Sequence, residues 1–136
     1  MGRVLGIDFG TKRIGLARSD PMKMIASPLK TIIAGKTLEE TADLITKECD
    51  EIETIVLGLP LLLSGKDSDT TTAVRKLAAL LEEKSGLPLI LWDERLTSKQ
   101  VEKLLIEGSV KRVSRTHHVD TMSATLILQN YLDTVG

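Results

Sequence analysis

One stretch near the N-terminus, from Arg3 to Ala17, constrains the fold of this chain more than any other segment. It reads RVLGIDFGTKRIGLA. Its valine, leucine and isoleucine residues favour β-strands, and Gly10 permits the positive φ of a tight turn, so the stretch predicts a β-hairpin. Asp8 falls at the C-terminal end of the first strand, where a fold exposes an acid for chemistry. Lys12 and Arg13 in the turn add two cations, which suits a site that receives both a metal and a phosphate.

Length and composition favour one domain, residues 1–136, with a substantial core, because 42% of the residues are hydrophobic. The net charge of −1 gives no global field toward nucleic acid, so any such binding must come from a local patch. Cys49 is the one cysteine, which excludes an internal disulfide and a cysteine-rich zinc site, and we expect it to be buried on a helix. Because the sequence has no signal-peptide pattern and no apolar run long enough for a bilayer, we expect a cytoplasmic protein without membrane association.

Hydrophobic periodicity and turn residues predict an α/β fold with a mixed sheet of five strands, the first three antiparallel, flanked by helices. Thr37 with Glu40, and Thr97 with Gln100, are expected to form capping boxes at helix starts. Gly86 is expected to end a helix. The expected strands lie near 4–8, 14–18, 29–34, 54–59 and 89–92, and the expected helices near 37–50, 73–85, 97–108 and 117–133.

Several acidic residues are expected to converge at one edge of this sheet. In open α/β sheets, ligands bind beyond the carboxyl ends of the parallel strands. Asp8, the corner from Gly58 to Pro60, and Asp93 with Glu94 all fall at such strand ends. Asp120 lies near the start of the last helix, on a face of small and apolar residues that favours packing against the sheet. The combination predicts a cluster of carboxylates.

Each acid also has a structural interpretation of its own. Asp8 could stabilise the turn that follows it. Asp93 and Glu94 could form an ordinary loop salt bridge with Arg95. Asp120 could interact favourably with the dipole of its helix. These interpretations stay open for each residue taken separately, and the functional hypothesis depends on their convergence.

Four motifs carry a resemblance to a known family. They are GIDFGTKRIGLA, GLPL from Gly58 to Leu61, DERLTS from Asp93 to Ser98, and VDTMSATLILQNYL from Val119 to Leu132. In this order and at this spacing they resemble the YqgF family, which is also called RuvX, over nearly the whole chain. That family is similar to the Holliday junction resolvase RuvC, so the resemblance implies a ribonuclease H-like fold.

The resemblance also implies a nuclease that holds Mg²⁺ or Mn²⁺ between carboxylates. Matched motif to motif, Asp8, Glu94 and Asp120 would be the catalytic and metal-binding acids, with Asp93 as a fallback ligand. Two metals about 3.5–4 Å apart can activate water, neutralise charge and stabilise the leaving oxygen in phosphodiester hydrolysis. The chain departs from the RuvC pattern at Gly58 to Pro60, where RuvC has an acid. Glu94 would have to compensate, and a site with one metal stays open.

Contacts to nucleic acid are expected from the segment KRVSRTHH, residues 111–118, which immediately precedes Asp120 and contains no acid. It could instead be a solvated loop. Because the chain has one Phe, one Tyr and one Trp, recognition by backbone shape is expected rather than base reading. The expected nucleic-acid-binding residues are Lys12, Arg13, Arg95, Lys111, Arg112, Arg115, His117 and His118.

Three functions follow as hypotheses. The first, which the resemblance implies, is a metal-dependent nuclease that acts on branched DNA or, as the other role proposed for the family, trims the precursor of small-subunit ribosomal RNA at its 5′ end. The second is a non-catalytic module that binds nucleic acid with the same fold. The third is an ATP-using phosphotransferase, because Asp-x-Gly-Thr hairpins also bind phosphate in actin-like folds, but 136 residues cannot supply the two domains required. Symmetric cutting of a DNA junction would require a homodimer, whereas end trimming would not.

Overall fold

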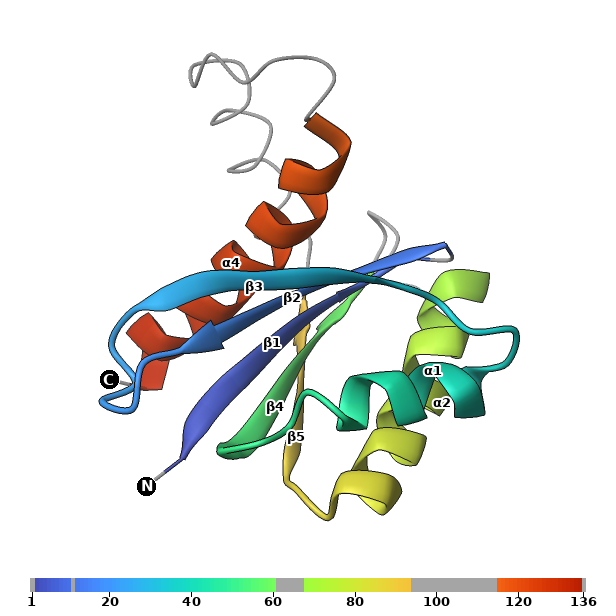
Figure 1. Ribbon diagram of the computed structural model, residues 1–136, viewed down its shortest axis with the longest axis horizontal. Helices are drawn as coiled ribbons and strands as arrows, with labels where there is room; N and C mark the ends of the chain where they lie inside the picture. The colour runs from blue at the N-terminus through green and yellow to red at the C-terminus, as the bar shows by residue number, and fades with distance from the viewer. Residues whose placement is uncertain (1, 11, 61–67, 94–114, 136) are drawn as a thin grey trace.

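A five-stranded mixed sheet organises the chain (Figure 1). The computed structural model describes residues 2–10, 12–60, 68–93 and 115–135, and for residues 115–120 and 135 it describes the backbone alone. The expected helix over 97–108, with its capping residues, lies outside the described residues. The elements in chain order are β1 (Arg3–Phe9), β2 (Arg13–Ser19), β3 (Ala26–Ile33), α1 (Leu38–Thr46), β4 (Ile52–Leu59), α2 (Asp69–Ser85), β5 (Leu89–Asp93) and α4 (Arg115–Val135).

The strand order of the sheet is β3-β2-β1-β4-β5. β1 pairs antiparallel with β2, and β2 pairs antiparallel with β3. The pairs β1–β4 and β4–β5 are parallel. The predicted mixed sheet with three antiparallel strands at its start is therefore confirmed. The carboxyl ends of β1, β4 and β5, at Phe9, Leu59 and Asp93, meet at one edge of the sheet, which we call the carboxyl edge.

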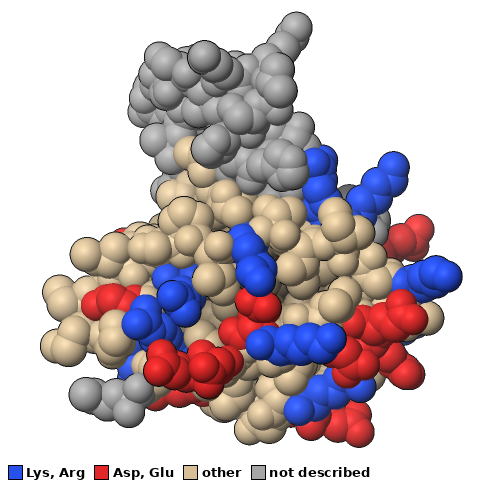
Figure 2. Space-filling view, viewed as in Figure 1, with Lys and Arg blue, Asp and Glu red and all other residues tan. Residues whose placement is uncertain are grey.

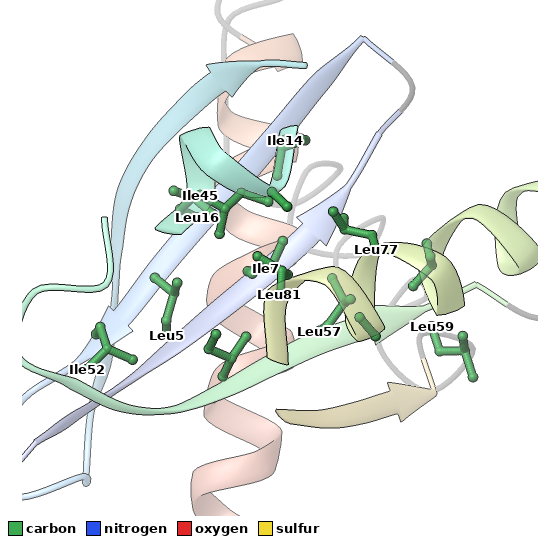
Figure 3. Packing of buried hydrophobic residues seen from close by; sticks show 14 residues of the cluster. Leu5, Ile7, Ile14, Leu16, Ile45, Ile52, Leu57, Leu59, Leu77 and Leu81 are labelled. Atoms are coloured by element: carbon green, nitrogen blue, oxygen red, sulfur yellow. The ribbon is translucent and has the colours of Figure 1, made fainter. Parts of the chain in front are cut away.

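Helices cover both faces of the sheet: α1 and α2 lie on one face and α4 lies on the other (Figure 1). Side chains alternate between the faces along each strand. In β1, Leu5 and Ile7 therefore join the core toward α1 and α2, whereas Val4 joins the core beneath α4. Figure 3 shows the aliphatic side chains that fill the first of these cores. Its fully buried members include Leu5, Ile7, Ile14, Leu16, Ile45, Ile55, Leu57, Leu77 and Leu81.

The backbone of β1 and helix α4 come unusually close at Gly6. A Cβ atom at this position would lie 2.7 Å from the Leu128 Cβ and 3.0 Å from the Ala124 carbonyl oxygen. Ala124 and Leu128 are fully buried on this side of the helix. Glycine at position 6 therefore lets α4 lie directly against the central strand. Among the described helices, none combines the length and the apolar character needed to cross a membrane.

β3 begins three residues earlier than predicted, because Pro28 lies inside the strand rather than in the preceding turn. β3 is an edge strand of the sheet, where the missing backbone N–H of a proline can face away from the ladder. A register shift between Leu16 and Ala17 of β2 lies opposite Pro28 and accommodates it. The sequence signal of proline as a turn residue was therefore wrong at this position.

Helix α1 has half of the predicted capping box and ends at Thr46, earlier than the predicted end near residue 50. The Thr37 side chain accepts a hydrogen bond from the Glu40 backbone N–H, as expected. The Glu40 carboxylate instead accepts from the Lys36 N–H, at 2.8 Å. Cys49 follows the helix and is half-buried against the core, so its predicted place on the helix was wrong. The chain must turn there to enter β4.

Helix α2 begins at Asp69, four residues before the predicted start. Ser68 caps it: its Oγ accepts from the Thr71 N–H at 3.2 Å, and the Thr71 Oγ1 accepts from the Ser68 N–H at 3.0 Å. The pattern Ser-x-x-Thr is a capping box in which threonine replaces the usual Glu or Gln. Gly86 ends the helix in the left-handed conformation, with φ 69°, which confirms its predicted role.

The substitution Gly6→Ala tests the close contact between β1 and α4. We expect a loss of about 1–3 kcal/mol in the free energy of unfolding, because the added methyl overpacks the site. Chemical denaturation measures this loss. In a Leu128→Gly background the same substitution should cost less, because the closest contacting atom, the Leu128 Cβ, is then removed. Equal costs in the two backgrounds would contradict the proposed contact.

Candidate active site at the carboxyl edge

Asp8 lies next to the last residue of β1, at the carboxyl edge, and pairs with Gly15 of β2. Its side chain is partly exposed. Alternation along the strand places Asp8 on the same face as Val4 and Gly6, both of which lie beneath α4. The acid predicted at the end of the first strand is therefore on the α4 face of the sheet.

Asp8 shares one row of the sheet with residues of β4 and β5. Ile7 pairs with Leu57 in β4, and the next residue of β4, Gly58, pairs with Trp92 in β5. Asp8, Gly58 and Trp92 therefore occupy one row across three parallel strands. Gly58 contributes no side chain to this row. The Trp92 ring packs edge-to-face against Tyr131 of α4, with the ring centroids 6.2 Å apart.

Contacts along α4 set the direction in which this helix crosses the sheet. Gln129 lies over the start of β3: its Oε1 accepts from the Ala26 N–H at 2.8 Å, and its Nε2 donates to the Met24 carbonyl at 3.0 Å. Gly6 of β1 lies under Ala124 and Leu128. α4 therefore runs antiparallel to β1, and its N-terminal turns extend toward the carboxyl edge. Asp120 is one helical turn before Ala124, and the side chain of Asp120 lies outside the described part.

Strand alternation places Asp93 and Asp8 on opposite faces of the sheet. Asp93 is the last residue of β5 and pairs with Leu59. Leu91, two residues earlier, packs in the core toward α1 and α2, and Asp93 shares that face by alternation. Glu94 lies outside the described residues. Over the described side chains, no group of three or more His, Cys, Asp and Glu is close enough to hold a metal. The ligand roles of all four acids stay predictions.

The turn after β1 is held by the backbone. A Cβ at Gly10 would collide with the Arg13 carbonyl oxygen, so a glycine is needed because the chain folds back on itself. The predicted positive φ at Gly10 was wrong, because Gly10 does not have a positive φ; among the described glycines, only Gly86 has one. The Lys12 carbonyl accepts from the Ala34 N–H at 2.9 Å, which ties this turn to the end of β3. The Lys12 side chain is exposed.

Arg13 is the first residue of β2 and pairs with Ile33 of β3, so its predicted place in the turn was wrong. The remaining predicted nucleic-acid contacts lie in the first turns of α4 or outside the described residues. Arg115, His117 and His118 belong to the first turns of α4, which begins two residues earlier than predicted. Their backbone positions precede Asp120 on the same helix. The remaining predicted residues, Arg95, Lys111 and Arg112, lie outside the described residues.

Charged side chains on the described surface are mixed in sign. Figure 2 shows Lys and Arg intermingled with Asp and Glu over the described part of the face drawn. Some of these charges form ion pairs, such as Lys30 with Glu48 and Lys84 with Asp43, each at 3.0 Å. Because charges of both signs are mixed over this surface, any electrostatic attraction for nucleic acid must come from a local patch.

Burial raises the pKa of the Cys49 thiol, which favours an inert thiol over a nucleophile.

A groove of about 320 Å³ lies at the same end of the sheet, on the α1 and α2 side. Phe9, Lys36, Thr37 and Asp69 are among the residues that line it. Sequence reasoning missed this groove, because its residues come from three separate segments of the chain. Phe9, an aromatic residue directly after Asp8 at the end of a strand, was the one signal that could have indicated it.

The substitution Gly10→Ala tests whether the turn after Asp8 depends on the close approach of the Arg13 carbonyl. We expect a loss of about 1–3 kcal/mol in unfolding free energy together with faster amide hydrogen exchange in β1 and β2, because the turn must open. Gly86→Ala is the matched control: its added Cβ meets nothing within 4 Å, so it strains α2 alone. Unchanged exchange in Gly10→Ala would contradict the contact.

Comparisons with known proteins assign the family. The family model described as "RuvX: Holliday junction resolvase" matches residues 2–134. A protein from Protochlamydia amoebophila, named "Putative pre-16S rRNA nuclease", is 46% identical, and the match covers 96% of this chain and 93% of that protein. A protein of the same name from Koribacter versatilis is 45% identical, over 99% of this chain and 89% of its own length.

Two solved structures show the same fold. RuvC from T. thermophilus, in complex with Holliday junction substrate, matches 99% of this chain and 97% of its own, with a TM-score of 0.61 and 14% identity. The fowlpox virus Holliday junction resolvase also has a TM-score of 0.61, with 12% identity over 98% of this chain and 99% of its own. The predicted ribonuclease H-like fold is confirmed by these similarities. The family model and the relatives together show that the chain belongs to the RuvX family.

Proposed function

We propose that this chain is a divalent-metal-dependent nuclease that hydrolyses phosphodiester bonds in the precursor of 16S ribosomal RNA. One observation carries the proposal. Asp8 lies at the carboxyl edge on the face that α4 covers, and the N-terminal turns of α4, which contain position 120, run toward the same edge. The names of the relatives favour this substrate, because they match nearly the whole chain at up to 46% identity. This substrate would place the protein in the cytoplasm.

The residues at the carboxyl edge fit a hard divalent cation. Carboxylate oxygens are the ligands that Mg²⁺ and Mn²⁺ prefer, and Gly58 adds no side chain to the row that contains Asp8. Asp8, Glu94 and Asp120 would hold the metal, whereas Asp93, the predicted fallback ligand, lies by strand alternation on the opposite face from Asp8 and is left out of this set. A bound metal would neutralise charge on the phosphate and lower the pKa of a bound water.

The chain itself would position the substrate around this edge. Lys12 follows Asp8 in the turn and Arg13 begins β2 directly after it, so their cationic groups would contact phosphates near Asp8. Arg115, His117 and His118 lie in the first turns of α4, on the chain segment that leads to Asp120. Contacts of this kind fix the orientation of a nucleic acid through its backbone rather than through its sequence.

A four-way DNA junction is the second candidate substrate, because the family model is described as a Holliday junction resolvase. The likeness to RuvC supports the fold alone, at 14% identity. Symmetric cutting of a junction requires two active sites and thus a homodimer, whereas trimming of an RNA end requires one. A non-catalytic binding module is the third alternative, and it predicts binding without turnover.

The substitution Asp8→Asn tests the proposed nuclease. Wild type and variant are compared on precursor 16S rRNA, a four-way DNA junction and linear duplex DNA, each with Mg²⁺, Mn²⁺ or chelator. We expect metal-dependent cutting of the precursor RNA by the wild type, and a loss of more than about a hundredfold in the variant, because an acid that contacts the metal is removed.

Asp50→Asn is the matched control, because Asp50 is an exposed acid just before β4, at the opposite end of that strand from the carboxyl edge. The Asp50→Asn protein should cut the precursor RNA at the wild-type rate. Preferred cutting of the DNA junction would replace the RNA assignment with a resolvase. Tight RNA binding without cutting by the wild type would contradict a nuclease and support the binding module.

A further inference from the structure

We propose that the groove beside Phe9, which we call the Phe9 groove, binds one unpaired nucleobase of the substrate, next to the bond that is cut. The Phe9 groove lies between β1, the β3–α1 loop and the first turns of α1 and α2. The inference rests on the proposed function, because it assumes that a nucleic acid crosses the carboxyl edge. It adds a contact to a base, which the shape recognition expected from the sequence does not include.

The lining of the Phe9 groove suits a flat, partly apolar ligand. Phe9, Leu38 and Ala73 provide an apolar surface, and Phe9 is half-buried because it also packs against the core. An aromatic ring that is fixed on one side and open on the other is the usual platform for an unstacked base. A volume of about 320 Å³ is at the small end of ligand pockets.

Polar groups at the rim favour a base over a phosphate inside the groove. Asp69 and Lys36 both line it, so its charge is balanced rather than positive. The Asp69 carboxylate would repel a phosphate, but it can accept a hydrogen bond from the amino group of a base. Lys36 is exposed and can contact the backbone phosphate that stays outside. Hydroxyl groups of Thr37 and Thr70 complete the rim.

The loop that forms one wall of the groove is held in place before any ligand binds. The Gly35 N–H donates to the Thr41 Oγ1 at 3.0 Å, and the Lys36 N–H donates to the Glu40 carboxylate at 2.8 Å. Thr41 is buried and also donates to the Thr37 carbonyl at 3.0 Å. A preformed wall reduces the conformational entropy that binding would otherwise remove.

The position of the Phe9 groove relative to Asp8 indicates which nucleotide would enter it. Asp8 and Phe9 are consecutive at the end of β1, so their side chains lie on opposite faces of the sheet at the same edge. A strand whose phosphate lies at Asp8 on the α4 face can turn over the edge and place a neighbouring base against Phe9. This geometry requires an unpaired base, because a base within a duplex is stacked and paired.

The inference is tested by removing the ring and the base separately. Binding of an RNA with a duplex and a single-stranded tail is measured for the full chain carrying Asp8→Asn, with an abasic nucleotide at each tail position in turn. At one position, loss of the base should weaken binding roughly 5- to 150-fold. Adding Phe9→Leu should weaken binding of the intact RNA by a similar factor, and the abasic change should then have no further effect.

Three further variants separate stacking from folding and from charge. Phe9→Tyr keeps an aromatic ring, so the Asp8→Asn protein with this change should bind the intact RNA as tightly as Asp8→Asn alone. Ala73→Leu leaves Phe9 unchanged but fills the groove, so it should reproduce the loss even if Phe9→Leu fails to fold. Lys36→Gln should reduce the salt dependence of binding without changing the abasic effect.

Two results keep this inference separate from the proposed function. If wild type cuts the precursor RNA but no tail position couples to Phe9, the groove inference is wrong and the nuclease assignment stands. If wild type cuts nothing but the coupling is found, the nuclease assignment is wrong and the base site stands.

Discussion

The close contact between α4 and the central strand at Gly6 is the constraint on which the proposed site depends. A side chain at position 6 would collide with Leu128 and with the backbone of Ala124, so glycine fixes how near the helix lies. Gln129 fixes the other end of the contact over the start of β3. Together they make α4 antiparallel to β1, and the part of the helix that contains Asp120 therefore extends toward the edge where Asp8 lies. The geometry of the acids follows from packing in the core.

The carboxyl edge joins two surfaces with different chemistry. On the α4 face, Asp8 shares a row with Gly58, which adds no side chain, and with the aromatic residue Trp92. On the α1 and α2 face, Phe9 opens into a groove with an apolar floor and a rim of balanced charge. Alternation along a strand places two consecutive residues on these two faces. One strand end can thus serve both cleavage and positioning of a nucleic acid.

Strand periodicity and the hairpin motif were sufficient to predict a mixed sheet of five strands with the first three antiparallel, whereas the strand order came from the structure. Local signals were less reliable where tertiary structure decides: Pro28 is tolerated within a strand because that strand lies at an edge, and Gly10 is needed for a close approach rather than for a positive φ. The start of α2 was missed because its capping box uses Thr71.

The sequence predicted some features of the candidate site, whereas others depend on the folded structure. Asp8 could be predicted at a strand end from the sequence, but the face on which it lies depends on the register with β2 and β4. The placement of Asp93 on the other face also needed that register. The Phe9 groove could not be predicted, since Phe9, Lys36 and Asp69 are brought together only by the folded chain.

The most direct test of the central claim is to measure Mn²⁺ binding by electron paramagnetic resonance in the wild type, Asp8→Asn and Asp120→Asn, without any substrate. If α4 brings position 120 to the face of Asp8, each substitution should weaken the same bound Mn²⁺ signal by at least about tenfold. Wild-type Mn²⁺ affinity in either variant would show that the two acids do not share one metal site and would contradict the account.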